Sequence, residues 1–394
     1  MKTDVTIIGA GPAGLLLSHL LHLEGISSVI IESRSRDAIE ATIRAGVLEQ
    51  STTDLLTEIG AGARMKKEGF VHAGFDLHFG GRSHRIDLEE LTGGRVITVY
   101  PQHEVLKDLI ALRLSTGADI RFEHRVTAVE DLTSDAPVVR FTDPEGVEHT
   151  LTSKFIAGCD GGYGVSKQAI PTDVRTDYFR DYAFGWFGIL ANAPPSSEEL
   201  IYANSSRGFA LISTRSPDVQ RMYFQCDPKD SVDNWDEARI WAELQARVEG
   251  RPEPLKEGPI FQKNIVPLRS LVTEPMQYGR LFLAGDAAHS VPPTGAKGLN
   301  LAASDVFLLA RGLASFFSTG ADEQLQTYST RALRRVWRAQ HFSWWMTSML
   351  HRFEGTAGAV PFDGKRQLAE LDAVTSSPAA SKFLAEMYAG LPFG

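Results

Sequence analysis

The chain has 394 residues, of which 43% are hydrophobic and 23% are charged, a composition typical of folded proteins with a large apolar core. Its net charge of -9, without any run of lysine or arginine, disfavours nucleic acid and anionic membranes as partners. Its two cysteines, Cys159 and Cys226, exclude a disulfide framework and a thiolate metal cluster, so we expect a cytoplasmic protein without a metal site.

The first elements are predicted to form a βαβ unit. Residues 5–8 are a β-branched run typical of a strand buried in a parallel sheet. A helix with one apolar face is predicted over residues 12–24, and a second strand over residues 29–32. The start of the chain lacks a signal-peptide pattern, and no apolar run reaches about 18 residues, so we expect no membrane span.

The turn after the first strand carries the motif Gly9-x-Gly11-x-x-Gly14. Glycines at these positions allow a tight turn and a close approach of a pyrophosphate to the helix N-terminus. Glu32, at the end of the second strand, is placed to accept hydrogen bonds from a ribose. Glycine triplets also occur in turns without function, but the strand, helix and acid in register favour a dinucleotide site. The motif alone leaves FAD and NAD both open.

The middle of the chain is richer in strands. Short strands are predicted over residues 75–79 and 96–100, then a helix over 102–114 and a hairpin over 138–158. Further strands are predicted over residues 182–190, 208–213 and 222–226, with one helix near 235–248. The predicted fold class is α/β, with a Rossmann-like dinucleotide-binding domain, a mainly β second domain and a helical C-terminal region. The predicted segments are 1–178, with a β insertion at about 70–100, then 179–275 and 276–394.

A second glycine-rich stretch, residues 285–298, favours a flavin over a nicotinamide as the bound dinucleotide. It follows a predicted buried strand at 279–283 and precedes a long helix that begins near Leu299. Asp286 can hold the ribityl hydroxyls of a flavin, and the helix can aim its positive end at the flavin pyrimidine. Asp286 and His289 could instead suggest a metal pair or a hydrolase dyad. Neither a third ligand nor a serine elbow supports these alternatives.

Four polar residues of a predicted hairpin form a candidate anion site. Side chains alternate along a strand, so Ser213 and Arg215 share one face, and Arg221 and Tyr223 share a face of the neighbouring strand. An arginine fork beside a hydroxyl suits a carboxylate. A solvated hairpin with exposed arginines is the alternative.

Together, GAGPAG with Glu32, the pair Asp160-Gly161 and GDAAHSVPPTGAKGLN resemble the signatures of the single-component FAD-dependent aromatic hydroxylases. The segments around Arg44, Tyr202 and Arg207 resemble the members of that family that act on 4-hydroxybenzoate. The resemblance implies bound FAD, reduced nicotinamide and dioxygen as co-substrates, and ring hydroxylation by a flavin hydroperoxide to 3,4-dihydroxybenzoate. It also implies a homodimer, for which an aromatic-rich helix at residues 342–353 would supply core and interface.

The same resemblance implies the site residues. Tyr202 would bind the phenolic oxygen, Tyr388 would bond Tyr202, and a proton relay would end at His72 near solvent. Arg221 would contact the flavin and govern its movement. Pro293 and Asn300 would line the reacting edge, so the implied catalytic residues are Tyr202, Tyr388, His72 and Pro293. The substrate contacts would be Tyr202, Ser213, Arg215, Tyr223 and Pro293. The FAD contacts would be Gly9, Gly11, Gly14, Glu32, Arg44, Gln102, Asp160, Arg221, Gly285, Asp286, Gly298, Leu299 and Asn300.

The nicotinamide site departs from the family pattern. Ser33 and Ala38 stand where relatives have an arginine and a tyrosine, and Tyr163 stands where a histidine is usual. Candidate nicotinamide contacts are Arg34, Arg36, Tyr163 and Arg269. Because acidic residues lie near Arg34 and Arg36, we expect NADH to serve at least as well as NADPH.

Three alternatives remain open from the residues. The same chemistry could act on another hydroxy- or aminobenzoate, or the chain could bind FAD without turnover. A plain NAD-dependent dehydrogenase is disfavoured because it would not need the stretch around Gly285 and Asp286.

Overall fold

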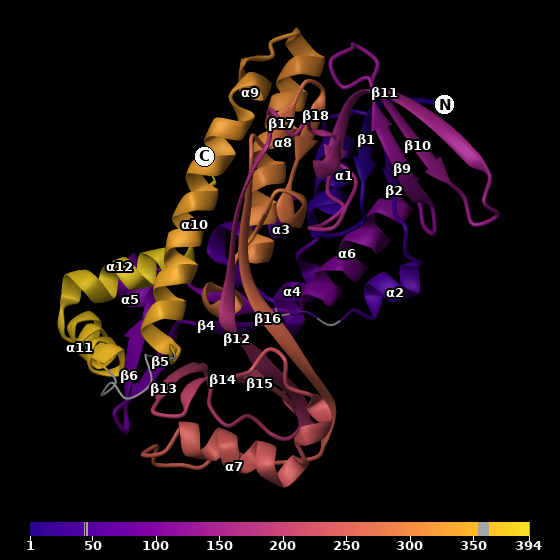
Figure 1. The fold of residues 1–394 in the computed structure, drawn as a ribbon. Coiled ribbons are helices and arrows are strands. Elements are labelled where there is room, and N and C mark those ends of the chain that lie inside the picture. Colours follow the sequence, from indigo (N-terminus) through magenta and orange to yellow (C-terminus); the bar gives the residue numbers. More distant parts are fainter. Residues whose placement is uncertain (43, 45, 354–361, 394) are drawn as a thin grey trace.

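The computed structural model describes residues 1–42, 44, 46–353 and 362–393, and it is built around two large sheets (Figure 1). The first sheet has the strand order β17-β18-β11-β1-β2-β8, and β10 and β9 continue it beyond β11. Its core strands β18, β11, β1, β2 and β8 are parallel neighbours, as predicted for a βαβ start. The strands are β1 (Lys2–Ile8), β2 (Ser28–Ile31), β8 (Asp119–Arg121), β9 (Arg125–Glu130), β10 (Val138–Thr142), β11 (Glu148–Gly158), β17 (Gln277–Tyr278) and β18 (Leu281–Leu283).

Helices α1 (Pro12–Leu23), α6 (Gln102–Ser115) and α8 (Gly298–Thr319) pack together with this sheet. Their apolar residues form one core with the central strands, in which Leu15, Leu17, Ile110 and Val306 are fully buried. By length and hydropathy α8 could cross a membrane, but 61% of its most apolar window is buried inside the protein, as in a core helix. Small helices α2 (Arg36–Glu40) and α9 (Glu323–Gln326) complete this half.

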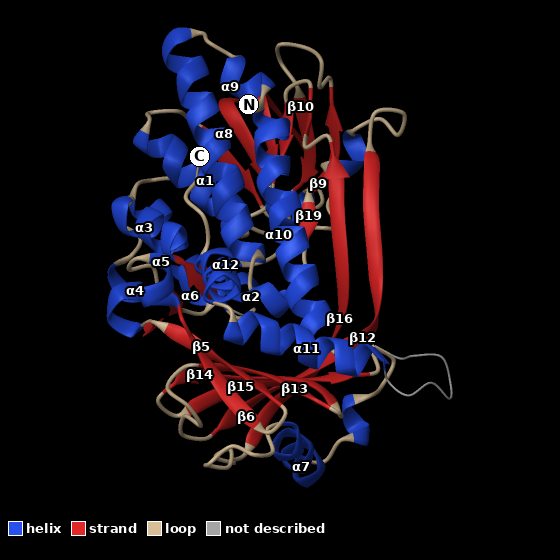
Figure 2. Ribbon diagram, turned by 90° about the vertical axis from the view of Figure 1, so that its left-hand side faces the viewer, coloured by secondary structure: helices blue, strands red, loops and turns tan. Residues whose placement is uncertain are grey.

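The second sheet is mostly antiparallel and has the order β19-β16-β12-β15-β14-β13-β5-β6. Two long strands, β12 and β16, run as a ribbon between the two halves of the molecule (Figure 2). The strands are β5 (Gly74–Phe79), β6 (Arg82–Asp87), β12 (Thr176–Asn192), β13 (Leu200–Ser205), β14 (Gly208–Ser216), β15 (Val219–Cys226), β16 (Ile260–Glu274) and β19 (His289–Ser290). The predicted insertion therefore joins the second sheet through β5 and β6, and the predicted boundary at residues 178/179 falls within β12.

The two faces of the second sheet bury different helices, because side chains alternate along each strand. Helix α7 (Glu237–Arg247) covers one face, where Phe187 and Phe224 are fully buried. Helices α10 (Tyr328–Leu350), α11 (Phe362–Ser376) and α12 (Pro378–Ala389) lie over the other face (Figure 2). Tyr202, Phe209 and Tyr223 share a buried core with these helices, so two of the candidate substrate residues, Tyr202 and Tyr223, lie on that face.

A small sheet and short helices join the two halves. The small sheet consists of β3 (Val47–Glu49), β7 (Ile97–Val99) and β4 (Phe70–His72), in the order β3-β7-β4. The short helices are α3 (Gln50–Glu58), α4 (Ala63–Glu68) and α5 (Leu88–Thr92).

Candidate functional site

The predicted phosphate-binding turn has open space where a pyrophosphate would lie. Gly9 has φ +102°, and a Cβ there would lie 2.4 Å from the Cys159 carbonyl oxygen. A Cβ at Gly14 would lie 2.0 Å from the Gly9 carbonyl oxygen, whereas one at Gly11 would meet no described atom within 4 Å. Gly9 and Gly14 therefore close the turn, and Gly11 leaves room in front of the free N–H groups of α1.

Glu32 lies behind this turn and already accepts protein hydrogen bonds. Its Oε2 accepts from the Ala10 amide at 2.8 Å, and its Oε1 accepts from the Arg34 amide at 2.8 Å. The carboxylate is fixed at the end of β2, where its remaining lone pairs can accept from a ribose.

The Gly285–Asp286 turn presents an exposed carboxylate beside an open helix start. The Asp286 side chain is 49% exposed and lies 3.4 Å from Nη1 of the exposed Arg44. A Cβ at Gly298, the first residue of α8, would meet no described atom within 4 Å. His289 instead pairs with the buried Asp305 at 2.6 Å, and Asp305 also accepts from the Gly285 amide. Asp305 raises the pKa of His289, so this pair supports the turn from behind.

Asp160 also indicates that a polar ligand binds in the candidate FAD site. Its Oδ2 accepts from the amide and hydroxyl of Ser166, both at 2.9 Å. Its Oδ1 is buried without a hydrogen-bond partner among the described residues. Burial raises the pKa of this carboxyl group. With the open turns at Gly11 and Gly298, this unpaired acceptor shows that the residues present fit an FAD.

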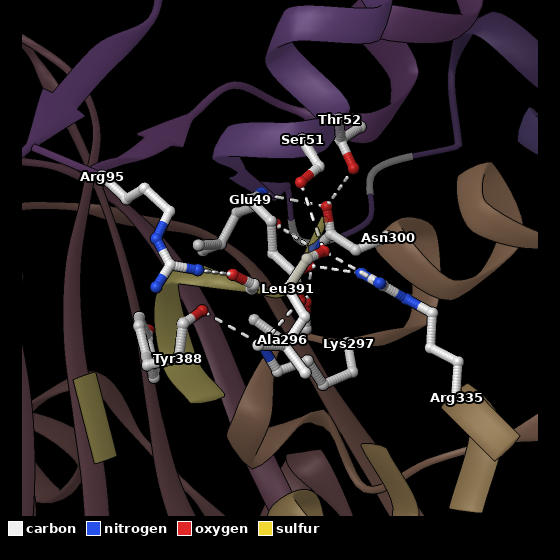
Figure 3. A network of polar contacts seen from close by, with 12 residues as sticks. Glu49, Ser51, Thr52, Arg95, Ala296, Lys297, Asn300, Arg335, Tyr388 and Leu391 are labelled. Atoms are coloured by element: carbon white, nitrogen blue, oxygen red, sulfur yellow. Dashed lines mark hydrogen bonds and ion pairs between the residues drawn. The ribbon is translucent and has the colours of Figure 1, made fainter. Parts of the chain in front are cut away.

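Figure 3 shows how the start of α8 is tied to β3 and to the C-terminal segment. Lys297 Nζ contacts Glu49 Oε1 at 2.6 Å and donates to the Tyr388 carbonyl oxygen at 3.0 Å. Arg335 Nη2 contacts the other Glu49 oxygen at 3.1 Å. Sequence reasoning missed this buried ion network, because its members lie far apart in the chain. It places Tyr388 against the helix that would face the flavin.

The role expected for Asn300 requires a correction. Its Oδ1 accepts from the Glu49 amide at 2.9 Å and from Thr52 Oγ1 at 2.8 Å, and its Nδ2 donates to the carbonyl oxygens of Val47 and Ala296. The residue is 1% exposed. A buried amide must satisfy its donors and acceptors, so the side chain braces α8 instead of lining the reacting edge. Pro293 lies half-buried in the loop before α8, as expected.

The hairpin of β14 and β15 brings the four predicted anion-binding residues together. Ser213 pairs with Arg221 across the strands, and its hydroxyl donates to the Arg221 carbonyl oxygen at 2.6 Å. The Arg221 guanidinium lies 5.0 Å from the centre of the Tyr223 ring. Arg215 donates to the Arg44 carbonyl oxygen at 3.0 Å. The solvated-hairpin alternative is wrong, since Arg221 is 8% exposed and Arg215 is half-buried.

These two arginines have no carboxylate partner within the described part of the chain. Burial and the neighbouring Arg221 lower the pKa of Arg215 to about 10, and Arg221 Nη1 is buried without a partner in the described residues. His103 also lies in the field of Arg215, and burial lowers its pKa. Two like charges held in a low-dielectric site are stabilised by a bound anion.

Tyr202 and Tyr388 are in direct contact, as the resemblance implied. Their hydroxyl oxygens are 2.6 Å apart, and the side chains are 1% and 2% exposed. Phe75 packs against both rings, with centroids 5.6 Å from Tyr202 and 4.4 Å from Tyr388. Burial raises the pKa of both tyrosines, so both hydroxyls are neutral in the protein alone.

The expectation that His72 lies near solvent is wrong. His72 is 2% exposed, and burial lowers its pKa. Among the described residues, both ring nitrogens lack a hydrogen-bond partner, and no hydrogen bond joins His72 to Tyr388. Strand β4 carries His72 into the small sheet, where neighbouring residues cover the ring. A relay through His72 would therefore need bridging water.

The candidate nicotinamide residues are exposed and partly paired with acids. Arg34 Nε lies 3.3 Å from Glu32, and Arg36 Nε lies 2.6 Å from Glu40. Arg269 Nη1 donates to the Tyr163 hydroxyl at 2.9 Å, and Tyr163 is 90% exposed.

Gln102, an expected FAD contact, is the first residue of α6.

Comparisons with known proteins give independent findings. The sequence profile of a family described as "FAD binding domain" matches residues 2–343. The p-hydroxybenzoate hydroxylase of Acinetobacter baylyi is 47% identical over 394 residues, which cover 100% of this chain and 96% of that protein. A probable NADH-specific resorcinol 4-hydroxylase of Rhodococcus jostii is 26% identical, over 82% of this chain and 61% of that protein. The crystal structure of p-nitrophenol 4-monooxygenase from Pseudomonas putida has the same fold, with a TM-score of 0.83, 20% identity and 99% of each chain covered.

Proposed function

Because the chain belongs to the FAD-dependent aromatic hydroxylase family, we propose that it hydroxylates 4-hydroxybenzoate to 3,4-dihydroxybenzoate with reduced nicotinamide and dioxygen. The relative from Acinetobacter baylyi bears the name of this activity and matches the whole chain. The observation that carries the substrate is the pair Arg215 and Arg221, which lack a carboxylate partner in the described chain, in a site that also contains Tyr202.

FAD, when bound, supplies the redox chemistry that activates dioxygen with electrons from the nicotinamide. The turn at Gly9–Gly14, Glu32, Asp160 and Asp286 would hold it. Arg44, Gln102 and the start of α8 at Gly298 and Leu299 would complete this site.

The chain's own residues bind and orient the substrate. Arg215 holds the carboxylate, with Arg221, Ser213 and Tyr223 around it. Tyr202 faces the phenolic oxygen, and its contact with Tyr388 begins a path along which each hydroxyl would accept one proton as it releases its own. Bridging water would carry the proton onward from Tyr388, with His72 as its expected end. A phenolate ring is more electron-rich than a phenol, so removing this proton favours attack at the neighbouring carbon. Pro293 closes the side toward α8.

The location and the assembly follow from the same family. We infer a cytoplasmic homodimer in which the exposed Trp344 and Phe383 of α10 and α12 contribute to the interface. Sedimentation of the purified protein tests this state directly.

The decisive experiment measures NADH and NADPH oxidation with a panel of benzoates and identifies each product by mass spectrometry. We expect yellow protein with one FAD per chain and 3,4-dihydroxybenzoate from 4-hydroxybenzoate. Conversion of another hydroxy- or aminobenzoate in preference would move the assignment to that substrate. Protein that takes up FAD but converts none of them would be the non-catalytic alternative.

A further inference from the structure

We propose that His351, which does not reach the substrate site, is a positioning residue that sets the distance between the two ends of that site. It does so through Trp186 and Phe209, which support Tyr223 at one end and Tyr202 at the other. The inference rests on the proposed function, because Tyr223 and Tyr202 are the substrate contacts in it.

The hydrogen bonds of His351 define its protonation state. Trp186 Nε1 is 2.7 Å from His351 Nε2, and an indole N–H can only donate, so Nε2 must be the acceptor. His351 Nδ1 is 3.0 Å from the Thr347 carbonyl oxygen, which can only accept, so Nδ1 carries the proton. The imidazole is therefore neutral, and burial accordingly lowers its pKa to about 3.

Aromatic rings hold this imidazole from several sides. It stacks on Phe209 with centroids 4.2 Å apart and on Phe184 at 4.8 Å. It is nearly parallel to Trp186, with 6° between the planes. His351 is fully buried, and Gln367 of α11 donates to its carbonyl oxygen at 2.6 Å. The sheet and α10 thus hold the ring, and α11 holds the backbone of the same residue.

The stack reaches both ends of the substrate site. Trp186 lies 5.0 Å from the Tyr223 ring, which is beside Arg221 at the carboxylate end. Phe209 lies 6.2 Å from the Tyr202 ring at the phenol end, and it also stacks on Trp186 at 4.9 Å. Because packed interiors transmit small displacements, a tilt of Trp186 moves Tyr223 relative to Tyr202.

The affinity of a ligand that contacts both ends of the site depends on the distance between Tyr223 and Tyr202. The affinity of a ligand that contacts only one end does not. 4-Hydroxybenzoate spans Arg215 and Tyr202, and benzoate reaches only the carboxylate end. A disturbed stack should therefore weaken 4-hydroxybenzoate more than benzoate. A general loss of packing would weaken both to the same extent.

The test is a double-mutant cycle of His351→Phe, Trp186→Phe and the double variant, in the FAD-loaded protein. His351→Phe leaves the Trp186 N–H buried without a partner, so we expect the Kd of 4-hydroxybenzoate to rise about tenfold and that of benzoate less than threefold. The double variant removes both polar groups and should recover most of this loss. His351→Gln keeps an acceptor for Trp186 and provides a second variant if His351→Phe does not fold.

The matched control is His78→Phe, since His78 is a buried histidine on the opposite face of the same sheet. It should leave both dissociation constants unchanged. Equal weakening of the two ligands by His351→Phe, or effects of the single substitutions that simply add, would overturn the inference. Wild-type protein that does not bind 4-hydroxybenzoate would overturn the proposed function as well, so the two failures are told apart by the wild type.

Discussion

Two residues, Arg215 and Arg221, give the hairpin of β14 and β15 an unbalanced positive charge. Glu104, the acid whose charge acts on Arg215, is engaged elsewhere, since it contacts Arg64 and Lys107. The Ser213 hydroxyl donates to the Arg221 carbonyl oxygen, so Arg215 is the principal donor to a carboxylate in the proposed function.

Arg215→Ala should weaken 4-hydroxybenzoate binding tens- to thousands-fold while FAD content stays normal. Removing one partner of a buried charge-assisted pair costs about 2–5 kcal/mol. A titration followed by flavin fluorescence measures the Kd, and Arg207→Ala, at an exposed arginine in the turn before β14, is the control. An unchanged Kd in Arg215→Ala would exclude this arginine as the carboxylate partner.

Tyr202→Phe should still bind substrate but lose the absorbance change of phenolate formation. The buried hydroxyl pair at 2.6 Å would be broken, so the phenol proton would lose its acceptor. We expect most of the oxidised nicotinamide to appear as hydrogen peroxide, measured against product. Tyr178→Phe, an exposed tyrosine, should behave as wild type, and full coupling in Tyr202→Phe would refute the proton path.

Three elements, the starts of helices α1 and α8 and the hairpin of β14 and β15, carry the proposed cofactor and substrate sites. Ala296, just before α8, has φ +53°, a left-handed conformation that is unusual for a residue with a side chain. The ion network of Glu49, Lys297 and Arg335 surrounds this loop (Figure 3). The strain is thus held by contacts to β3 and the C-terminal segment.

Gly11→Val, at the start of α1, should abolish FAD binding without unfolding the chain. Its side chain would enter space that no described atom occupies, and that space is where the pyrophosphate would lie. Gly14→Val is the contrasting variant, because its side chain would overlap the Gly9 carbonyl and prevent folding. Absorbance of bound flavin and a thermal midpoint separate the two results, and flavin retained in Gly11→Val would contradict the predicted site.

The acids around α2 should make NADH at least as good a co-substrate as NADPH. Arg36 is held by Glu40 at 2.6 Å, so it is not free to bind a 2′-phosphate. Glu40→Gln should raise kcat/KM for NADPH relative to NADH, and Glu58→Gln, on the distant helix α3, should not. A preference of about a hundredfold for NADPH in the wild type would show that Arg34 and Arg36 bind the phosphate despite their acidic neighbours.

Histidines that are neutral in the folded chain should make the stability of the whole protein decrease in acid. Burial lowers the pKa of His19, His72, His78, His103 and His351 in the folded chain. Below about pH 6.5 the unfolded chain binds protons at these positions and the folded chain does not. The free energy of unfolding therefore decreases as the pH is lowered. His289 and the half-buried Asp76, Asp108 and Asp160 have raised pKa values and act in the opposite direction.

Urea unfolding of the FAD-loaded protein at pH 7.5 and pH 5.5 measures this effect. For His351 alone, with a pKa of about 3 in the folded state, the loss is about 1.4 kcal/mol per pH unit in the middle of its window. His351→Phe should flatten the pH dependence even if it lowers stability at pH 7.5. An equal slope in the variant and the wild type would show that this histidine does not contribute.

Local sequence patterns predict the elements whose defining residues lie close together in the chain. The β-branched run, the glycine spacing and the apolar faces fixed β1, α1, β2 and the flavin turns, because strand and helix periodicities and tight turns depend on residues close in the chain. Alternation along each strand likewise predicted that Ser213 and Arg215 share a face and that Arg221 and Tyr223 share one, and the register of β14 and β15 brings the two pairs together.

Which distant residues meet depends on how the helices and sheets pack, and local patterns do not encode it. Tyr202 and Tyr388 are 186 positions apart, and Glu49 and Lys297 are 248 apart, so no local pattern pairs them. The sequence also did not predict burial. In the structure His72 is buried away from solvent, and the buried Asn300 side chain braces α8. Family resemblance proposed the tyrosine pair, but packing alone showed the buried ion network and the stack around His351, because such contacts arise when whole elements close on one another.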